Sequence, residues 1–209
     1  MIWAVVVAAG SGARFGARKQ YAELDGRRVL DWSVVAARSV ADGVVLVVPP
    51  DRLDDPEKDV DAVVGGGATR SDSVRNGLAA VPADAGVIVV HDAARPRATP
   101  ELFAAVVAAL DAGAGADSAG ADGAVPVLAI TDTVKRVRYG QVVGTVDRAE
   151  LVTVQTPQAF KAAALRRAHA FGGQATDDAA LVEARGGRIV AVAGETSNIK
   201  ITTAGDLDL

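Results

Sequence analysis

The stretch that decides the fold is IWAVVVAAGSGAR, residues 2–14, in which an apolar run passes directly into a loop of small residues. Because the run is apolar on successive residues, it indicates a strand covered on both faces. Similar runs recur at 43–48, 60–64, 86–90, 123–127, 152–155 and 188–192. Helical patterns separate them at 29–40, 73–81, 100–110 and 158–171, and Thr99 before Pro100 is a typical helix start. This alternation predicts an α/β fold with a mostly parallel sheet, whose ligands bind at the carboxyl ends of the strands.

One segment interrupts the alternation. Between residues 131 and 148 polar and apolar residues alternate on either side of Gly140, which is typical of a β-hairpin. A two-stranded ribbon is marginal in water by itself, so we expect it to pack against something else, most simply a second subunit. We therefore predict a single domain over residues 1–209 with a hairpin arm over 131–148 that serves dimerisation.

Composition excludes several classes of protein. The 209 residues carry 22 Lys and Arg against 26 Asp and Glu, a net charge of −4, so no overall positive field attracts a nucleic acid. With no cysteine and two histidines, thiolate chemistry, disulfides and Cys- or His-rich metal centres are excluded or disfavoured. The apolar runs are shorter than the roughly 20 residues that span a bilayer, and no cation precedes the first one. We expect a cytoplasmic protein without membrane or nucleic-acid partners.

The glycine loop after the first run is the sharpest local motif. Ala8, Ala9, Gly10 and Gly12 let a backbone approach a nucleotide and offer N–H groups to phosphate. A dinucleotide fingerprint needs a third glycine where Phe15 stands, and the Gly-Lys-Ser/Thr of a Walker A loop is absent. The same residues would also suit a tight turn between a strand and a helix that binds no ligand. The cations Arg14 and Lys19 follow at once, where they can act on phosphate oxygens or remain ordinary surface charges.

Two further segments follow predicted strands. Residues 65–78 begin with three glycines, including Gly67, that permit close backbone approach. Arg70 follows, and Ser73 lies on the first turn of the next helix, where its hydroxyl can contact a base or simply belong to a capping segment. Residues 87–96 end a buried strand with His91-Asp92-Ala93, which puts a carboxylate at the sheet edge where Mg²⁺ bound to phosphates needs an oxygen ligand. An Asp in this position is often only a helix cap or loop former. We interpret His91 as a structural hydrogen-bonding residue.

In order along the chain, these segments resemble those of the 2-C-methyl-D-erythritol 4-phosphate cytidylyltransferase family of the non-mevalonate isoprenoid pathway. The resemblance covers essentially the whole chain and includes the glycine loop with Arg14, Lys19-Gln20-Tyr21, the 67–74 and 90–96 segments, Asp132-Thr133-Val134-Lys135, Thr145-Val146-Asp147-Arg148, Gln155-Thr156-Pro157-Gln158, Thr176-Asp177-Asp178 and Asn198-Ile199-Lys200-Ile201-Thr202. It implies a Rossmann-like nucleotidyltransferase sheet flanked by helices. It also implies transfer of the cytidylyl group of CTP to 2-C-methyl-D-erythritol 4-phosphate with release of pyrophosphate.

The resemblance also implies roles for particular residues. Arg14 and Lys19 would stabilise the transition state, and Arg148 and Lys200 would position the methylerythritol phosphate, with Thr133 beside them. Asp92 would lie at the Mg²⁺ site. The hairpin arm would cross to the neighbour in a homodimer, so that Thr133 and Arg148 serve the partner's active site. The nucleotide would be held by Ala8, Ala9, Gly10, Gly12, Gly67, Arg70, Ser73, Asp92 and Ala93.

The sequence departs from this family in the first loop and leaves other functions open. The segment between Arg14 and Lys19 is shorter than is usual in the family. Arg18 stands where a proline is common, so Arg18 could share the role of Lys19. Ala68 occupies a position where an acidic residue is frequent. A ribitol 5-phosphate cytidylyltransferase shares the nucleotide-side motifs. A non-catalytic nucleotide-binding module is a second alternative, and a dinucleotide-dependent oxidoreductase is a remote third.

Overall fold

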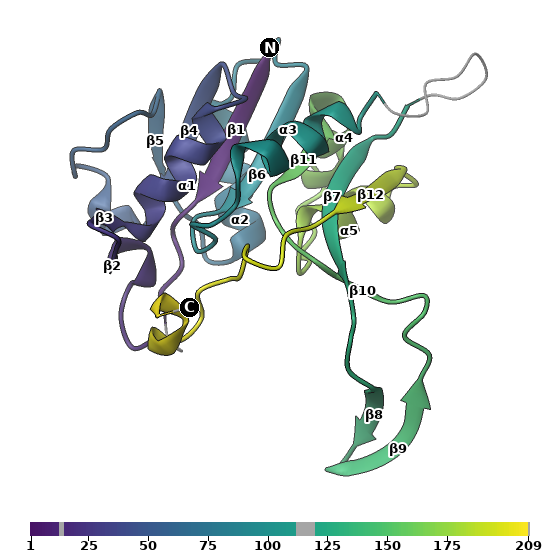
Figure 1. Cartoon of the computed structure of the whole chain (residues 1–209). Coiled ribbons are helices and arrows are strands. Elements are labelled where there is room, and N and C mark those ends of the chain that lie inside the picture. Colours follow the sequence, from purple (N-terminus) through teal and green to yellow (C-terminus); the bar gives the residue numbers. More distant parts are fainter. Residues whose placement is uncertain (13–14, 112–119, 209) are drawn as a thin grey trace.

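The computed structural model describes residues 1–12, 15–111 and 120–208. Within this part the chain forms an eight-stranded sheet in the order β10-β7-β11-β6-β1-β4-β5, with β12 paired to β7 as well (Figure 1). Strands β1, β4, β5 and β6 are mutually parallel, whereas β11 is antiparallel to both β6 and β7. The predicted α/β fold with a mostly parallel sheet is confirmed.

Helices cover both faces of this sheet because its central strands are apolar on both sides. In β1, Ala4 and Val6 belong to a core with α1 and α3, whereas Val5 belongs to a core with α2, α4 and α5. Leu46 of β4 and Ile88 of β6 continue the two cores on opposite faces. Period-two alternation of side chains thus divides one apolar run between two helical layers.

The bounds of the elements follow the sequence patterns closely in the first half of the chain. They are β1 Ile2–Val7, η1 Lys19–Tyr21, β2 Glu23–Leu24, β3 Arg27–Arg28, α1 Val29–Arg38, β4 Gly43–Val48, η2 Pro50–Arg52, β5 Ala62–Gly65, α2 Arg70–Ala80, β6 Val87–Asp92, α3 Pro100–Ala108, β7 Gly123–Ala129, β8 Val134–Arg138, β9 Gln141–Val146, β10 Val152–Val154, β11 Gln158–Lys161, α4 Ala162–His169, α5 Asp178–Glu183, β12 Ile189–Ala193 and η3 Ala204–Leu207. Thr99 caps α3 by accepting a hydrogen bond from the Leu102 N–H at 3.1 Å, as its position before Pro100 predicts.

The main differences from the sequence prediction concern β11, α2 and α5, and the short elements β2, β3, η1, η2 and η3 were not predicted either. Residues 158–161, predicted as the first turn of a helix, form β11, because Gln158 to Lys161 pair with β6 and fill the sheet between β6 and β7. Helix α2 begins at Arg70 rather than Ser73, since Thr69 caps it by accepting from the Asp72 N–H. Helix α5 has no counterpart in the prediction. In each case a strand pairing or a helix cap, which the spacing of apolar residues does not reveal, determines where the element begins.

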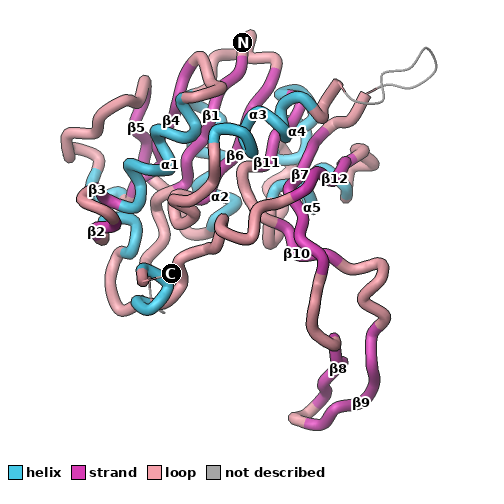
Figure 2. The backbone as a smooth tube through the Cα atoms, viewed as in Figure 1, coloured by secondary structure: helices cyan, strands magenta, loops and turns pink. Residues whose placement is uncertain are grey.

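The predicted hairpin is confirmed as β8 and β9, joined by Tyr139 and Gly140. Both turn residues have positive φ, 50° and 78°, as a tight hairpin turn requires. Figure 2 shows the hairpin extending away from the body of the sheet, connected to β7 by residues 130–133 and to β10 by residues 147–151. Its apolar side chains are exposed in the single chain, including Val137, Tyr139, Val142 and Val143. In the described part of the chain, every helix is too short or too polar to cross a membrane.

Candidate functional site

A cavity of about 560 Å³ lies at the carboxyl ends of β1 and β6. In the sheet, β1 lies between β4 and β6, so the chain leaves β1 at the point where the strand order reverses. Open α/β sheets place their ligand sites in this crevice. The site expected from the strand pattern is therefore present as a hollow in the structure.

The glycine loop after β1 forms one wall of the cavity and is held from behind by Gln20. This side chain is buried, and its Nε2 donates to the carbonyls of Ala8 at 2.6 Å and Gly10 at 3.0 Å. Gly12 has a φ of +68°, and a Cβ there would lie 1.8 Å from the carbonyl oxygen of Ala17. The shape of the loop thus depends on glycine at position 12 and on a side chain of η1, the element that also carries Lys19.

The loop after β5 forms the opposite wall and is tied to the start of α2. Ser73 Oγ accepts from the Gly67 N–H at 3.1 Å and donates to the carbonyl of Thr69 at 3.0 Å. Gly66 lies so close to the first loop that a Cβ there would be 2.2 Å from Cβ of Ala9. Ser73 and the glycines therefore bring the two walls together, and the hydroxyl oxygen has a second lone pair with which to accept a bond from a ligand.

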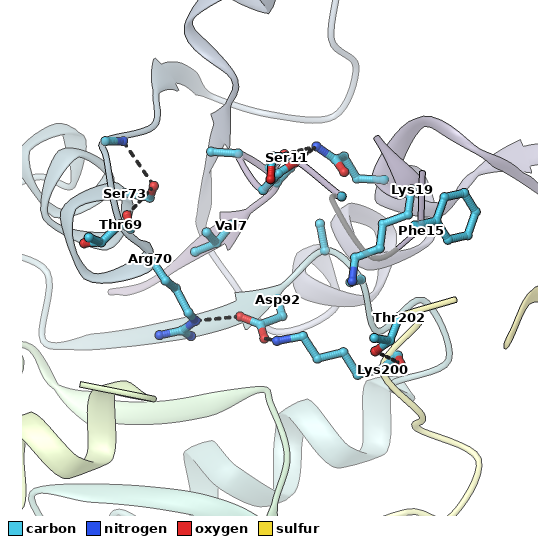
Figure 3. Close-up of a pocket in the computed structure, with 18 of the residues that line it drawn as sticks. Val7, Ser11, Phe15, Lys19, Thr69, Arg70, Ser73, Asp92, Lys200 and Thr202 are labelled. Atoms are coloured by element: carbon cyan, nitrogen blue, oxygen red, sulfur yellow. Dashed lines mark hydrogen bonds and ion pairs between the residues drawn. The ribbon is translucent and has the colours of Figure 1, made fainter. Parts of the chain in front are cut away.

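Charged side chains gather at the floor of the cavity around Asp92, the last residue of β6. Arg70 Nε donates to Asp92 Oδ1 at 2.9 Å, and Lys200 Nζ lies 2.5 Å from Asp92 Oδ2. Figure 3 shows Arg70 and Lys200 approaching this carboxylate from opposite sides, with Lys19 pointing toward the same space. Asp92 is the only acidic residue among the described residues that line the cavity. The site as a whole is therefore cationic.

The carboxyl group of Asp92 is ionised despite its burial. Burial by itself raises the pKa of this group, but the nearby charges of Arg70 and Lys200 outweigh it and hold the pKa well below its usual range. Arg70 responds in the opposite sense: burial opposes its charge, yet Asp92 and Asp178 raise its pKa above the ordinary value. Arg70 and Asp92 thus stabilise each other's ionised form.

The C-terminal segment brings Lys200 to the cavity and also contacts Lys19. In Figure 1 this segment crosses beneath the carboxyl ends of the central strands. The Ile201 N–H donates to the carbonyl of Ala94 at 2.8 Å, and Lys19 Nζ donates to the carbonyl of Ile201. Gln155 clamps the preceding turn, since its Nε2 donates to the carbonyls of Glu195 and Asn198 at 2.8 and 3.1 Å. Two cations far apart in sequence are thus held beside one another.

Most of the site residues predicted from the sequence line this one cavity. They are Ala8, Ala9, Gly10, Gly12, Lys19, Gly67, Arg70, Ser73, Asp92, Ala93 and Lys200. Arg14 lies outside the described residues. The sequence left open that Arg18 shares the role of Lys19. In the structure Arg18 instead pairs with Asp51 at 2.8 Å and is not among the lining residues. Of the predicted site residues within the described ranges, all but two therefore meet at the cavity.

The remaining two, Thr133 and Arg148, lie at the base of the hairpin arm and do not line the cavity of their own chain. Arg148 Nη1 donates to the carbonyl of Thr131. His91 is fully buried and lies 3.1 Å from Thr156 Oγ1 and 3.2 Å from the carbonyl of Arg95, in agreement with its structural interpretation. Its pKa is lowered by burial to about 4, so it is neutral at physiological pH.

Several residues behind the site were not assigned a role from the sequence. Gln20 and Gln155 belong to motifs that the sequence analysis identified, but those motifs do not predict that the two side chains bind backbone carbonyls. Asp178 accepts from Arg70 Nη1 at 2.8 Å and lies 2.9 Å from His169 Nε2. The only sequence signal for this position is its place in Thr176-Asp177-Asp178, which also matches an ordinary helix start.

The donor set fits a divalent cation that takes most of its ligands from phosphate and water. Mg²⁺ commonly binds through one or two carboxylates together with substrate phosphates, and Asp92 supplies one ionised carboxylate. Among the described residues no cluster of three or more His, Cys, Asp or Glu side chains forms a complete protein cage. A cation at Asp92 would therefore depend on a bound phosphate and would share Oδ2 with Lys200 or displace it.

Comparison with known proteins gives a consistent result. The sequence profile of a family described as 2-C-methyl-D-erythritol 4-phosphate cytidylyltransferase, IspD, matches residues 2–209. A curated enzyme of that name from Rhodococcus jostii (strain RHA1) is 44% identical over 215 residues, which cover 99% of this chain and 92% of the relative. The crystal structure of the enzyme of that name from Thermus thermophilus superposes with a TM-score of 0.81 at 34% identity, covering 98% of this chain and 94% of that one.

Other relatives are longer than this chain. The bifunctional enzyme IspD/IspF of Clavibacter michiganensis subsp. michiganensis (strain NCPPB 382) is 46% identical over 220 residues, which cover 97% of this chain but 52% of the relative. The bifunctional enzyme IspD/IspF of Nitratidesulfovibrio vulgaris (strain DP4) is 42% identical over 231 residues, with 98% and 56% covered. The chain thus spans about half the length of the bifunctional relatives.

Proposed function

The chain belongs to the 2-C-methyl-D-erythritol 4-phosphate cytidylyltransferase family, and from that membership we propose that it catalyses the reaction of CTP with 2-C-methyl-D-erythritol 4-phosphate. An oxygen of the acceptor phosphate attacks the α-phosphorus of CTP, and the bond between the α-phosphorus and the bridging oxygen breaks. The electron pair of that bond leaves with pyrophosphate. The other product is 4-diphosphocytidyl-2-C-methyl-D-erythritol.

The observation that carries this proposal is the cationic floor between two glycine-rich walls. Lys19, Arg70 and Lys200 all line the cavity, against a single acidic residue, Asp92, among the described lining residues. A nucleoside triphosphate needs close backbone approach for its base and phosphates, and cations for its negative charge. The walls supply the first requirement, and the lysines with Arg70 supply the second. We place the cytosine between Ala8, Ala9, Gly67 and Ser73, with the triphosphate along Gly10 and Gly12.

The chemistry requires charge and orientation rather than a general base. A phosphomonoester has a second pKa near 6, so the acceptor is already a dianionic nucleophile at neutral pH. Asp92, with its lowered pKa, is a poor proton acceptor but a good partner for cations. We assign to Lys19 and Arg14 the stabilisation of charge on the α-phosphate, and to Lys200 the acceptor phosphate. Lys200 would then offset the repulsion between two anions that must come into line.

We propose that Mg²⁺ accompanies CTP and that Asp92 supplies its protein ligand. When bound, the cation would neutralise phosphate charge and stabilise the leaving pyrophosphate. Arg70 would keep Asp92 ionised and fixed. Lys200 Nζ contacts Asp92 Oδ2, so its ammonium group lies beside the proposed cation ligand, where it would contact the acceptor phosphate.

We further propose that the enzyme is a homodimer in which the arm reaches the partner's site. Support comes from the arm itself: it extends from the body, and its apolar residues Val137 and Val142 are 56% and 65% exposed in the single chain. Such side chains on a free two-stranded ribbon favour burial against another surface. Thr133 and Arg148 would then contact the acceptor bound to the partner. Because the proposed substrate is CTP, we also propose that the enzyme is located in the cytoplasm.

Pyrophosphate release with CTP and Mg²⁺ tests the proposal, with methylerythritol phosphate and ribitol 5-phosphate supplied at equal concentration. We expect release with the first acceptor. Release with ribitol 5-phosphate alone would keep the nucleotide site and overturn the acceptor. Binding of CTP without release in the presence of either acceptor would favour a non-catalytic nucleotide-binding module.

A further inference from the structure

Asp178 lies behind the cavity at the first residue of α5, with no exposed surface. Its two carboxylate oxygens have different partners. Oδ2 accepts from Arg70 Nη1 at 2.8 Å, and Oδ1 lies 2.9 Å from Nε2 of the buried His169. Asp178 is not among the residues that line the cavity, so any effect that it has on a ligand must pass through Arg70.

Arg70 therefore links two buried carboxylates through different nitrogens. Its Nε donates to Asp92 and its Nη1 to Asp178, while Nη2 is buried and has no hydrogen-bond partner among the described residues. Nε and Nη2 form one edge of a guanidinium group. This is an edge that binds both oxygens of a carboxylate in a bidentate pair. In this structure, the edge makes only one of its two possible bonds.

The missing bond matters because Asp92 has only two oxygens. A bidentate pair with Arg70 would direct Nε to one oxygen and Nη2 to the other. Instead, Oδ2 of Asp92 contacts Lys200 Nζ at 2.5 Å, on the side of the cavity. The position of Arg70 thus leaves one oxygen of Asp92 available to groups other than Arg70.

We propose that Asp178 is a positioning residue for the transfer reaction: by holding Nη1 of Arg70, it prevents the guanidinium from binding both oxygens of Asp92. Oδ2 of Asp92 is thereby reserved for Lys200 and for a divalent cation that arrives with the nucleotide. This inference rests on the proposed function. His169 contributes by occupying the other oxygen of Asp178, so that this carboxylate has a fixed orientation when Arg70 binds it.

The test is Asp178→Asn, which keeps the size of the side chain and removes its charge. In a crystal structure of this variant, we expect Arg70 Nη2 within hydrogen-bond distance of Asp92 Oδ2, and Lys200 Nζ displaced from it. In kinetic assays, we expect kcat at fixed Mg²⁺ to fall about 10- to 100-fold, the usual effect of losing a residue that orients a metal ligand. The Mg²⁺ concentration for half-maximal rate should rise, and KM for CTP should stay unchanged.

Asp177→Asn is the matched control, because it makes the same chemical change one residue earlier. Asp177 caps α5 by accepting from the Ala180 N–H at 3.0 Å and accepts from Gln158 Nε2 at 2.9 Å. An asparagine can still cap the helix. This variant weakens a hydrogen bond beside α5 but leaves Arg70 untouched, so its kcat and Mg²⁺ dependence should equal those of the wild type.

The outcomes separate this inference from the proposed function. If the wild type turns over and Asp178→Asn retains full kcat and the same Mg²⁺ dependence, the positioning role is wrong and the proposed function stands. If the wild type releases no pyrophosphate, the proposed function fails, and the position of Arg70 in the variant crystal structure decides the role of Asp178.

Loss of a buried charge can also prevent folding. In that case the wild-type structure with CTP and Mg²⁺ decides. Arg70 Nη1 should remain on Asp178 with Nη2 away from Asp92 Oδ2, and a bidentate pair between Arg70 and Asp92 would overturn the proposal.

Discussion

Replacement of Gly66 by alanine tests whether the two walls of the cavity must approach as closely as they do. The new Cβ would lie 2.2 Å from Cβ of Ala9 and 3.0 Å from Oγ of Ser73. Two carbon atoms pack at about 3.5 Å or more, so the walls must separate by at least about 1.3 Å at this point. The backbone of Gly66 has no positive φ, so the cost is steric.

The magnitude follows from this overlap. Forcing one extra methyl group into a packed site costs about 1–3 kcal/mol. If the two loops must close around the base against that cost, the free energy of CTP binding becomes less favourable by the same amount. Since about 1.4 kcal/mol corresponds to a factor of ten in affinity, CTP should bind about 5- to 150-fold more weakly. The melting temperature should also fall, because the same overlap opposes the approach of the two loops in the folded protein.

Isothermal titration with CTP gives the affinity, and circular dichroism confirms that the variant is folded. The control is Gly86→Ala, just before β6 and at the other end of that strand from the cavity, where an added Cβ would meet only the carbonyl oxygen of Met1, at 3.8 Å. It should bind CTP as the wild type does. A folded Gly66→Ala protein with wild-type CTP affinity would refute the placement of the base between the two loops.

Three further predictions concern the acceptor, the buried histidine and the arm. Lys200→Ala should still bind CTP while kcat falls about 100-fold or more, since the cation that holds the acceptor phosphate in line is lost; loss of CTP binding would instead assign Lys200 to the nucleotide. Burial lowers the pKa of His91 from 6.5 to about 4, so between these pH values the unfolded chain binds a proton that the folded protein does not. The free energy of unfolding should therefore be unaffected by His91 above pH 6.5 and fall by up to about 3 kcal/mol as the pH drops to 4. Urea unfolding at pH 7 and 4.5 should show a smaller decline for His91→Gln, and an equal decline would contradict this. Val142→Asp should yield monomers in light scattering if the exposed arm forms the dimer; an unchanged dimer would rule out that contact, and a monomeric wild type would rule out the dimer.

Local sequence patterns were enough to predict most strands of the main sheet and the loops that border the cavity. Residues 43–48 were predicted as a strand with the bounds of β4, because an unbroken apolar run is a local property. The turn at Gly140 and the cap at Thr99 were likewise predicted from their immediate neighbours. Glycines after successive strands indicated a ligand site because parallel strands share one carboxyl edge.

The partners of these residues, by contrast, depend on how the chain folds in three dimensions. The strand at 158–161 exists because β6 and β7 leave a place between them, which the helical pattern of 158–171 does not reveal. Arg70 meets Asp178 across 108 positions, and Lys19 meets the backbone of Ile201 across 182. A local pattern specifies the backbone conformation and the buried face of a segment. The pairing of distant charges depends on how whole elements pack, and that information is spread over the chain rather than carried by any one motif.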